Sequence, residues 1–401
     1  MRQAFDVVVI GAGPIGGYLA RSLNNHGHSV LLVEEHDEIG RPFQCAGLVN
    51  PRAMEKAQLE KTILTNIWGA NIHSPEGRNV RVGNPTTNRT FSVCRKLFDE
   101  GIVLQSIETG TEIKLSSKPI SVTMEDDRCA VTIDGPSGLE EIECKLICGA
   151  DGAHSWVRRK FRMGKPSETL IGFQIEVTGY EGEEGMLDMY TGKSFAPGFF
   201  SWAIPSGQTT RIGTWSKPEL MGGLSSEQFL ERLMSNEQLN SKFANCSEIG
   251  RYCGPVPTGI VRRPLKERVA LFGDAAGICK PTTGGGIGPG FKQVDILVPK
   301  LSLAIESNRL GESDMKRISS SMDQMRRDQR KKRALRDAFL TEMDDNELER
   351  IFRVWARPEV TDLINEVGDI ENPIPLGIRM LREVPEFRRL AGRAAKAVLW
   401  G

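Results

Sequence analysis

Three glycines near the N-terminus, in the run Gly11-Ala-Gly13-Pro-Ile-Gly16, have the spacing of a phosphate-holding loop. The first glycine would permit a tight turn, and the second would let backbone amides approach a pyrophosphate. The third would let the following helix pack close to the strand, with its N-terminal dipole facing the phosphates. The spacing alone is weak evidence, because glycine-rich turns between strand and helix also form for structural reasons.

The elements on either side of the glycines strengthen this interpretation. Residues 7–10 are a continuous β-branched run, as expected for a parallel strand that is buried on both faces. Apolar residues then recur at helical spacing, and a second strand over 28–35 reaches Glu34. In dinucleotide sites an acid about 20 residues beyond the loop binds a ribose hydroxyl. The sequence therefore predicts a βαβ unit that binds a dinucleotide.

Two further turns repeat the pattern of a buried strand that runs into small residues. One carries Asp151, and the other carries Asp274, which is followed by a glycine-rich stretch over 284–290. Such an aspartate can receive a ribitol hydroxyl, and a glycine loop at a helix N-terminus can hold a flavin pyrimidine oxygen. Each turn alone could equally be an ordinary glycine turn with a capping aspartate. Three such turns in this order favour a flavin dinucleotide.

The composition excludes several classes of function. Lys plus Arg and Asp plus Glu each number 52, so no global basic footprint for nucleic acid is present. The eight cysteines include no CxxC pair, so we expect no metal site and a reduced cytoplasmic protein. No apolar run reaches the ~18 residues of a transmembrane helix, and the first strand begins too early for a signal peptide.

The remaining segments change character along the chain. A helix that follows residue 94 is expected to turn Phe98, Ile102, Ile107 and Ile113 toward a core. From about 165 to 258 the pattern is mostly extended and antiparallel in character. From residue 291 onward the composition is helical and heavily charged.

Two charged segments stand out in this helical part. The run RRDQRKKRALR over 326–336 is typical of a solvated helix face. The last segment, over 384–401, places its apolar residues on one helical face and its basic residues largely elsewhere. That pattern suits either an interfacial membrane helix or a docked core helix.

The order of these motifs resembles that of a known family of flavin enzymes. GAGPIG, Arg95 in CRKLFDE, GADGAHS and FGDAAG follow one another as in flavoproteins of the p-hydroxybenzoate hydroxylase fold. Within that fold the chain is similar to the archaeal geranylgeranyl reductases, and the resemblance covers roughly residues 1–300. The stretches that carry it are RPFQCAG (41–47), PGFFSWAIP (197–205) and KPTTGGGIGPG (280–290).

The resemblance implies an α/β fold. It consists of a Rossmann-like FAD-binding domain, an inserted and mainly antiparallel β substrate domain, and C-terminal helices. The expected FAD-binding domain is discontinuous and takes 1–61, 92–163 and 255–305; the substrate domain takes 62–91 and 164–254; and the helical region takes 306–401.

The resemblance also implies a cofactor and an activity. The cofactor is FAD, and the activity is the saturation of double bonds in geranylgeranyl chains of archaeal ether lipids. Reduced flavin would deliver the hydride, and a proton would add to the other carbon. The implied FAD contacts are Gly11, Gly13, Pro14, Ile15, Gly16, Glu34, Cys45, Ala46, Gly47, Arg95, Asp274, Gly286 and Ile287.

Cys45 is the candidate catalytic residue. Its thiol could relay a proton, or it could be a small residue that packs beneath the flavin ring. The implied substrate-binding residues would form an apolar pocket wall, although clustered aromatics are more often plain core. These residues are Phe199, Phe200, Trp202 and Pro205.

The substrate motif departs from the family pattern P-x-x-Y-x-W-x-F-P at two positions. Pro197, Trp202 and Pro205 match it, whereas Phe200 replaces the tyrosine and Ile204 replaces the phenylalanine. The apolar lining is kept, but a phenol hydroxyl is lost.

Two other functions compete with lipid reduction. The first is a flavin monooxygenase of the same fold that hydroxylates an aromatic acid, and the second is a non-catalytic electron carrier. The large inserted domain argues against the carrier. Only one complete GxGxxG is present, so the electron donor is open among NAD(P)H, ferredoxin and a reduced deazaflavin. A peripheral contact with the membrane is compatible with a lipid substrate.

Overall fold

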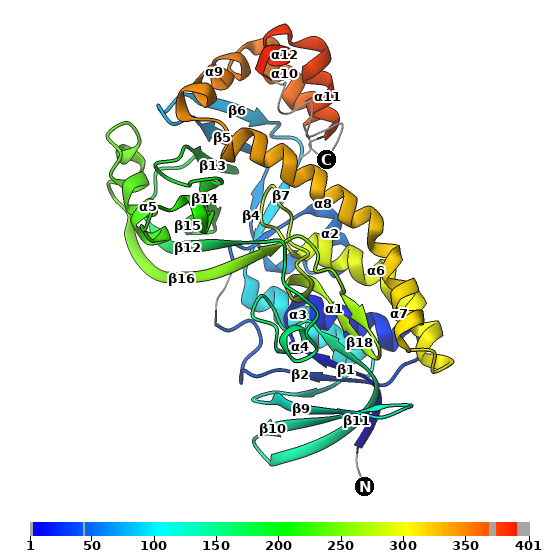
Figure 1. Ribbon diagram of the computed structural model, residues 1–401. Helices are drawn as coiled ribbons and strands as arrows, with labels where there is room; N and C mark the ends of the chain where they lie inside the picture. Colours follow the sequence, from blue (N-terminus) through cyan, green and yellow to red (C-terminus); the bar gives the residue numbers. More distant parts are fainter. Residues whose placement is uncertain (1–2, 43–44, 369–373, 391–401) are drawn as a thin grey trace.

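The computed structural model describes residues 3–42, 45–368 and 374–390. A sheet at the N-terminal end, a second sheet with its own helix, and a column of C-terminal helices follow one another along the molecule (Figure 1). The first sheet has the order β17-β18-β11-β1-β2-β8, with β10 and β9 continuing from β11. Its strands are β1 (Gln3–Ile10), β2 (Val30–Val33), β8 (Glu112–Lys114), β9 (Lys118–Met124), β10 (Cys129–Gly135), β11 (Gly138–Gly149), β17 (Leu265–Lys266) and β18 (Val269–Leu271).

The centre of this sheet is parallel, and both of its faces are covered. β1 pairs in parallel with β11 and β2, and β11 pairs in parallel with β18. Val7 and Val9 pack with helices on one face, whereas Val8 and Ile10 join a second cluster on the other face. This alternation follows from the two-residue period of a strand. The helices on the first face are α1 (Pro14–Asn25), α2 (Pro51–Ala57), α3 (Arg95–Glu108), α6 (Ile287–Glu306) and α7 (Glu312–Ser319); α4 (Trp156–Lys160) packs with the second cluster.

Three of the four expected core residues after residue 94 do face the core, but the expected helix is too long. Phe98 and Ile102 are fully buried in α3, and Ile113 packs against the same core from β8, whereas Ile107 is 40 % exposed. Positions 98 and 107 are nine residues apart, which is about half a turn out of phase on a helix. Ile113 lies beyond the stop at Gly110, whose φ of +109° ends the helical path.

The second sheet is mainly antiparallel. Its order is β16-β12-β15-β14-β13-β5-β6, and among the described strands only β13 and β5 pair in parallel within it. Both segments expected in the substrate domain contribute strands to it, and that division stays a proposal. Its members are β5 (Gly69–His73), β6 (Asn79–Gly83), β12 (Glu168–Thr178), β13 (Met186–Thr191), β14 (Phe200–Ser206), β15 (Thr209–Ser216) and β16 (Ser247–Thr258), with α5 (Ser226–Met234), η2 (Pro218–Leu220) and η3 (Asn240–Phe243) inserted between strands.

A three-stranded sheet lies between these two regions. It has the order β3-β7-β4, so it joins the segment after Cys45 to the strand that leads into α3. Its strands are β3 (Leu48–Val49), β4 (Ile63–Ile67) and β7 (Thr90–Val93), and the short helix η1 (Glu60–Thr62) precedes β4.

The C-terminal helices extend from α7 to the far end of the second sheet (Figure 1). α9 packs on β6, where Val80, Leu348 and Phe352 form a buried cluster. No helix among the described residues is long and apolar enough to cross a membrane. The helices and turns of this region are η5 (Ser320–Met322), α8 (Asp323–Arg336), the π-helical turn η6 (Asp337–Thr341), α9 (Asp345–Trp355), α10 (Pro358–Val367), α11 (Ile374–Glu383) and α12 (Pro385–Leu390).

The structure describes all of the charged run over 326–336 and the start of the segment over 384–401. The run over 326–336 is not simply a solvated face, because Gln329 and Arg336 are buried in α8. The amphipathic segment over 384–401 lies largely outside the described residues. At its start, Val384 and Phe387 are buried among the C-terminal helices.

Candidate functional site

In the glycine loop between β1 and α1, close packing leaves no room for a side chain at Gly11 or Gly16, whereas Gly13 has free space in front of it. A Cβ on Gly11 would lie 2.6 Å from the carbonyl oxygen of Ala150, and one on Gly16 would overlap the carbonyl oxygen of Gly11. Gly13, the N-cap of α1, has an ordinary φ of −69°, and a Cβ there would meet no atom within 4 Å. The space in front of Gly13 and the N-terminus of α1 is therefore open.

Glu34 lies beside this loop, just beyond the end of β2. Its Oε2 accepts a hydrogen bond from the backbone amide of Ala12 at 2.7 Å. Its Oε1 faces His36, with the backbone amide at 3.1 Å and Nδ1 at 2.6 Å. The carboxylate is thus held at the glycine loop from both sides. Sequence reasoning missed His36, whose only signal was its position two residues after the acid.

Asp274 lies in the short helix η4 (Gly273–Ala276), next to the start of α6. Cys279 Sγ donates to its Oδ1 at 3.1 Å, and burial raises the pKa of this carboxyl above its ordinary value. A Cβ on Gly286, the N-cap of α6, would lie 2.8 Å from the same Oδ1. The carboxyl therefore meets the first turn of the helix that begins at Ile287.

Ile15, in the first turn of α1, packs against η4 and the first turn of α6. A Cβ on Gly290 would overlap its Cδ1, and one on Gly273 would lie 3.1 Å from its Cγ1. Pro14 is the first residue of α1, where its missing amide costs no hydrogen bond. The two fingerprints, far apart in sequence, thus form one continuous surface.

Cys45 lies in the loop before β3 and is half-buried. The backbone amide of Gly47 donates to its Sγ at 3.3 Å. Arg95, at the start of α3, pairs with Asp99 through two hydrogen bonds of 2.9 and 2.7 Å. Burial lowers the pKa of Arg95, but the Asp99 carboxylate and, when ionised, the Cys45 sulfur outweigh burial and raise this pKa above its ordinary value. Positions 43 and 44 of the same motif lie outside the described residues.

Arg211 is a site residue that sequence reasoning did not find. It projects from β15 of the second sheet, is 3 % exposed, and donates through Nη1 to the carbonyl oxygens of Ala46 and Val93, each at 3.1 Å. A Cβ on Gly47, whose φ is +78°, would overlap this guanidinium nitrogen. Arg211 therefore fastens the Cys45 loop to the second sheet. Its only sequence signal was a lone charge among the uncharged residues of 209–216.

The expected substrate residues face the same loops. Phe199, Phe200 and Trp202 are 1 %, 8 % and 4 % exposed and form one buried cluster, while Pro205 is half-buried. Ala46 and Leu48 of the Cys45 loop pack against this cluster. Among the described residues the rings pack on one another, so the expected apolar pocket wall stays a prediction.

Trp215 connects this aromatic cluster with the second glycine loop. Its ring centroid lies 4.7 Å from that of Trp202 and 5.5 Å from that of Phe199. A Cβ on Gly284 would overlap its six-membered ring. The aromatic cluster, the Cys45 loop and the loop before α6 therefore meet at one place.

The residues present fit FAD. An open helix N-terminus at Gly13 suits a pyrophosphate, and the carboxyls of Glu34 and Asp274 lie where ribose and ribitol hydroxyls would be received. The buried hydroxyls of Thr282 and Thr283, in the loop before α6, have no hydrogen-bond partner within the described residues. A bound group that offers polar atoms would satisfy them.

Comparison with known proteins identifies the cofactor and the family. Residues 4–312 match the FAD binding domain family. The chain is 30 % identical over 297 residues to digeranylgeranylglycerophospholipid reductase 1 of Methanococcoides burtonii, covering 72 % of each chain. It is 29 % identical over 314 residues to digeranylgeranylglycerophospholipid reductase 2 of Methanothermobacter thermautotrophicus, covering 76 % of this chain and 80 % of the relative.

Solved structures confirm the fold. A geranylgeranyl bacteriochlorophyll reductase-like protein from Thermoplasma acidophilum superposes with a TM-score of 0.85 at 20 % identity, covering 98 % of this chain and 99 % of the other. A flavin-dependent brominase follows with a TM-score of 0.72 at 17 % identity, covering 91 % and 93 %. The expected α/β fold class and the FAD cofactor are therefore confirmed. The chain belongs to the FAD-binding-domain flavoproteins and, within them, to the digeranylgeranylglycerophospholipid reductase family.

Proposed function

We propose that this protein is an FAD-dependent reductase that saturates the double bonds of geranylgeranyl chains in archaeal ether phospholipid precursors. The observation that carries the proposal is the meeting of the Cys45 loop, the loop before α6 and the aromatic cluster at one place. Membership of the reductase family supports the same activity. A monooxygenase has the same fold, but the curated relatives compared above are named as reductases.

The aromatic cluster suits a hydrocarbon substrate. A geranylgeranyl chain offers no charge or hydrogen-bonding group, so its affinity must come from buried area, at ~25 cal/mol per Å² before the cost of ordering the chain. Phe199, Phe200 and Trp202 supply apolar surface with few rotamers to fix. We propose that these rings separate to admit the chain and then line it, with Pro205 at the end of the wall.

The residues around Cys45 hold its sulfur in place. FAD, when bound and reduced, supplies the hydride for the alkene. Cys45 Sγ is held by the Gly47 amide and lies beside the Arg95 guanidinium. We propose that its thiol relays the proton to the second carbon. Arg211 acts at a distance, because it holds the Ala46 carbonyl and so fixes the loop that carries the thiol.

The proposed reaction needs two partners, a lipid substrate and an electron donor. The substrate is an isoprenoid lipid, and we propose that the protein contacts a membrane surface to collect it. The electron donor would be a small reductant or a redox protein, for which NAD(P)H, ferredoxin and a reduced deazaflavin are the candidates. A transient encounter suits this step, since the sequence holds only one complete GxGxxG.

Expression in cells that make geranylgeranylated ether lipids tests the activity. The expected result is partly or fully saturated chains by mass spectrometry, absent from cells that express Gly13→Val. Oxygen uptake by the purified protein with an aromatic acid and a pyridine nucleotide, together with unchanged lipids, would instead indicate the monooxygenase.

A further inference from the structure

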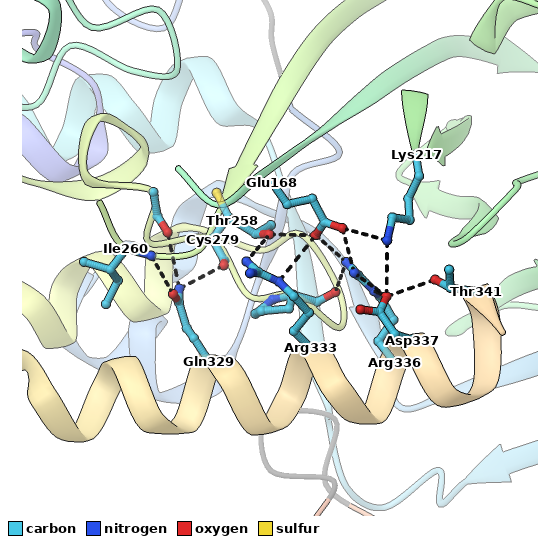
Figure 2. A network of polar contacts seen from close by, with 12 residues as sticks. Glu168, Lys217, Thr258, Ile260, Cys279, Gln329, Arg333, Arg336, Asp337 and Thr341 are labelled. Carbon is cyan, nitrogen blue, oxygen red and sulfur yellow. Dashed lines mark hydrogen bonds and ion pairs between the residues drawn. The ribbon is translucent and has the colours of Figure 1, made fainter. Parts of the chain in front are cut away.

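The charged helix α8 turns two polar side chains toward the flavin domain. Gln329 and Arg336 are seven residues apart, about two turns, so they project from the same side of the helix. They are 9 % and 3 % exposed, respectively. Figure 2 shows both directed at the segment that leads from η4 toward the glycines before α6. This face of α8 is therefore an interior surface rather than a solvated one.

Gln329 fastens the first part of that segment. Its Nε2 faces the carbonyl oxygens of Gly277, Ile278 and Cys279 at 3.4, 2.9 and 3.1 Å. Its Oε1 accepts from the amide of Ile260 at 3.0 Å. One side chain thus satisfies several backbone groups on the path that leaves Asp274.

Arg336 fastens the next part and uses all five of its N–H donors. Nη1 donates to Glu168 Oε2 at 2.7 Å and to the carbonyl oxygen of Pro281 at 3.2 Å. Nη2 donates to Glu168 Oε1 at 2.8 Å and to Asp337 Oδ1 at 2.6 Å, and Nε donates to the same Oδ1 at 3.1 Å. A lysine offers only three donors, so it could not reproduce this set.

Arg336 is not the only cation that neutralises the carboxylates of Glu168 and Asp337. The carboxylates of Glu168 and Asp337 also face Lys217 Nζ, at 3.1 and 3.4 Å. Arg333 Nε lies 3.7 Å from Glu168 (Figure 2). Without Arg336, two carboxylates would still face two cations. Loss of Arg336 would instead remove the guanidinium that donates to the Pro281 carbonyl.

Arg336 also touches the aromatic cluster. Its guanidinium carbon lies 5.7 Å from the centroid of the Phe199 ring, within the range of a cation–π contact. The π-helical turn η6 begins at the next residue, and Leu340 of this turn packs against the same aromatic cluster. Turns of this kind occur often at functional sites.

We propose that Arg336 is a positioning residue that sets the flavin-binding loop, through the Pro281 carbonyl, and the aromatic wall, through Phe199. The C-terminal helical region is then part of the catalytic unit, because α8 fixes the path between Asp274 and the N-terminus of α6. The proposal rests on FAD binding and does not depend on which lipid is reduced. Its test therefore remains informative if the proposed function fails.

Titration of the apoprotein with FAD, followed by flavin fluorescence, tests the proposal. Of the five hydrogen bonds that Arg336→Met removes, the one to the Pro281 carbonyl holds the flavin-binding loop, and its loss is expected to weaken FAD binding by about tenfold and to alter the visible flavin spectrum. Arg333→Met is the matched control, because Arg333 faces the same carboxylate but donates to Thr258 Oγ1, at 3.1 Å, where Arg336 donates to the Pro281 carbonyl. It should retain wild-type affinity and spectrum.

A purely structural role predicts different results. If both variants weakened FAD binding equally, or if Arg336→Met kept wild-type affinity and spectrum, the proposal would be overturned. Should Arg336→Met fail to fold, Arg336→Lys replaces it, because the lysine keeps the charge but lacks the fork. Weaker FAD binding by a folded Arg336→Lys supports the proposal, and wild-type binding contradicts it.

Discussion

Replacing Gly13 by valine separates cofactor binding from folding. A Cβ at Gly13 meets no protein atom within 4 Å, and the φ of −69° is one that valine adopts readily. The change at this N-cap should cost about 1 kcal/mol of stability at most. Gly16→Val is the contrasting variant, because its Cβ would overlap the Gly11 carbonyl oxygen and should destabilise the fold itself.

The expected loss of FAD affinity follows from the same geometry. The open space in front of Gly13 is where backbone amides at the N-terminus of α1 would meet the pyrophosphate. If a valine side chain there removes two charge-assisted hydrogen bonds, each worth roughly 1.5 kcal/mol, affinity falls by about 100-fold.

Flavin content after purification and the melting temperature of the apoprotein together measure these effects. Gly13→Val should be colourless and folded, with a near-wild-type melting temperature. A folded variant that retains stoichiometric FAD would show that the pyrophosphate does not lie at this loop. Release of FMN rather than FAD from the wild-type protein would also refute the assignment.

Three further predictions address the substrate side and the charged cluster. Cys45→Ser should keep FAD but slow double-bond reduction or leave the chains only partly saturated. If full saturation continued at an unchanged rate, the thiol would have only a packing role. Trp202→Ala should slow the reduction of long prenyl chains more than that of short ones, with an unchanged flavin spectrum. Equal losses of activity on long and short chains would show that Trp202 does not line the chain. Burial raises the pKa of Glu168, but Arg336 and Lys217 outweigh burial and hold this pKa at about 2. The ionised carboxylate should therefore stabilise the fold by roughly 3 kcal/mol above about pH 4.5, the ordinary pKa of the group. That stability should disappear as the pH falls toward 2, and melting curves of Glu168→Gln should show a flatter acid limb than the wild type; identical limbs would contradict the pairing.

The parts of the site that sequence could predict are those set by local spacing. The glycines of the first loop, Glu34 and Asp274 follow buried strands directly, so the turn chemistry is visible within a few residues. The βαβ unit was predictable for the same reason, whereas the α/β fold class with its inserted sheet was implied by the resemblance to the flavoprotein family. The end of α3 was misplaced, because apolar residues continue past the stop at Gly110 although their spacing is no longer helical.

The parts that sequence missed depend on contacts between distant segments. Arg211 reaches the carbonyl of a residue 165 positions away, and Arg336 reaches a carboxylate 168 positions away. No local spacing signals such pairs, and a charged residue in a strand or helix is usually solvated. Their burial becomes visible only when the sheets and helices are assembled.

Anaerobic incubation of the purified, chemically reduced holoprotein with a geranylgeranyl ether phospholipid shows whether the bound flavin reduces the double bonds of the lipid. Mass spectrometry of the extracted lipid is the readout, with the FAD-free Gly13→Val protein as control. We expect each saturated double bond to add two hydrogens to the lipid and the flavin to be reoxidised in step. An unchanged lipid in the presence of fully reduced, bound flavin would contradict this expectation.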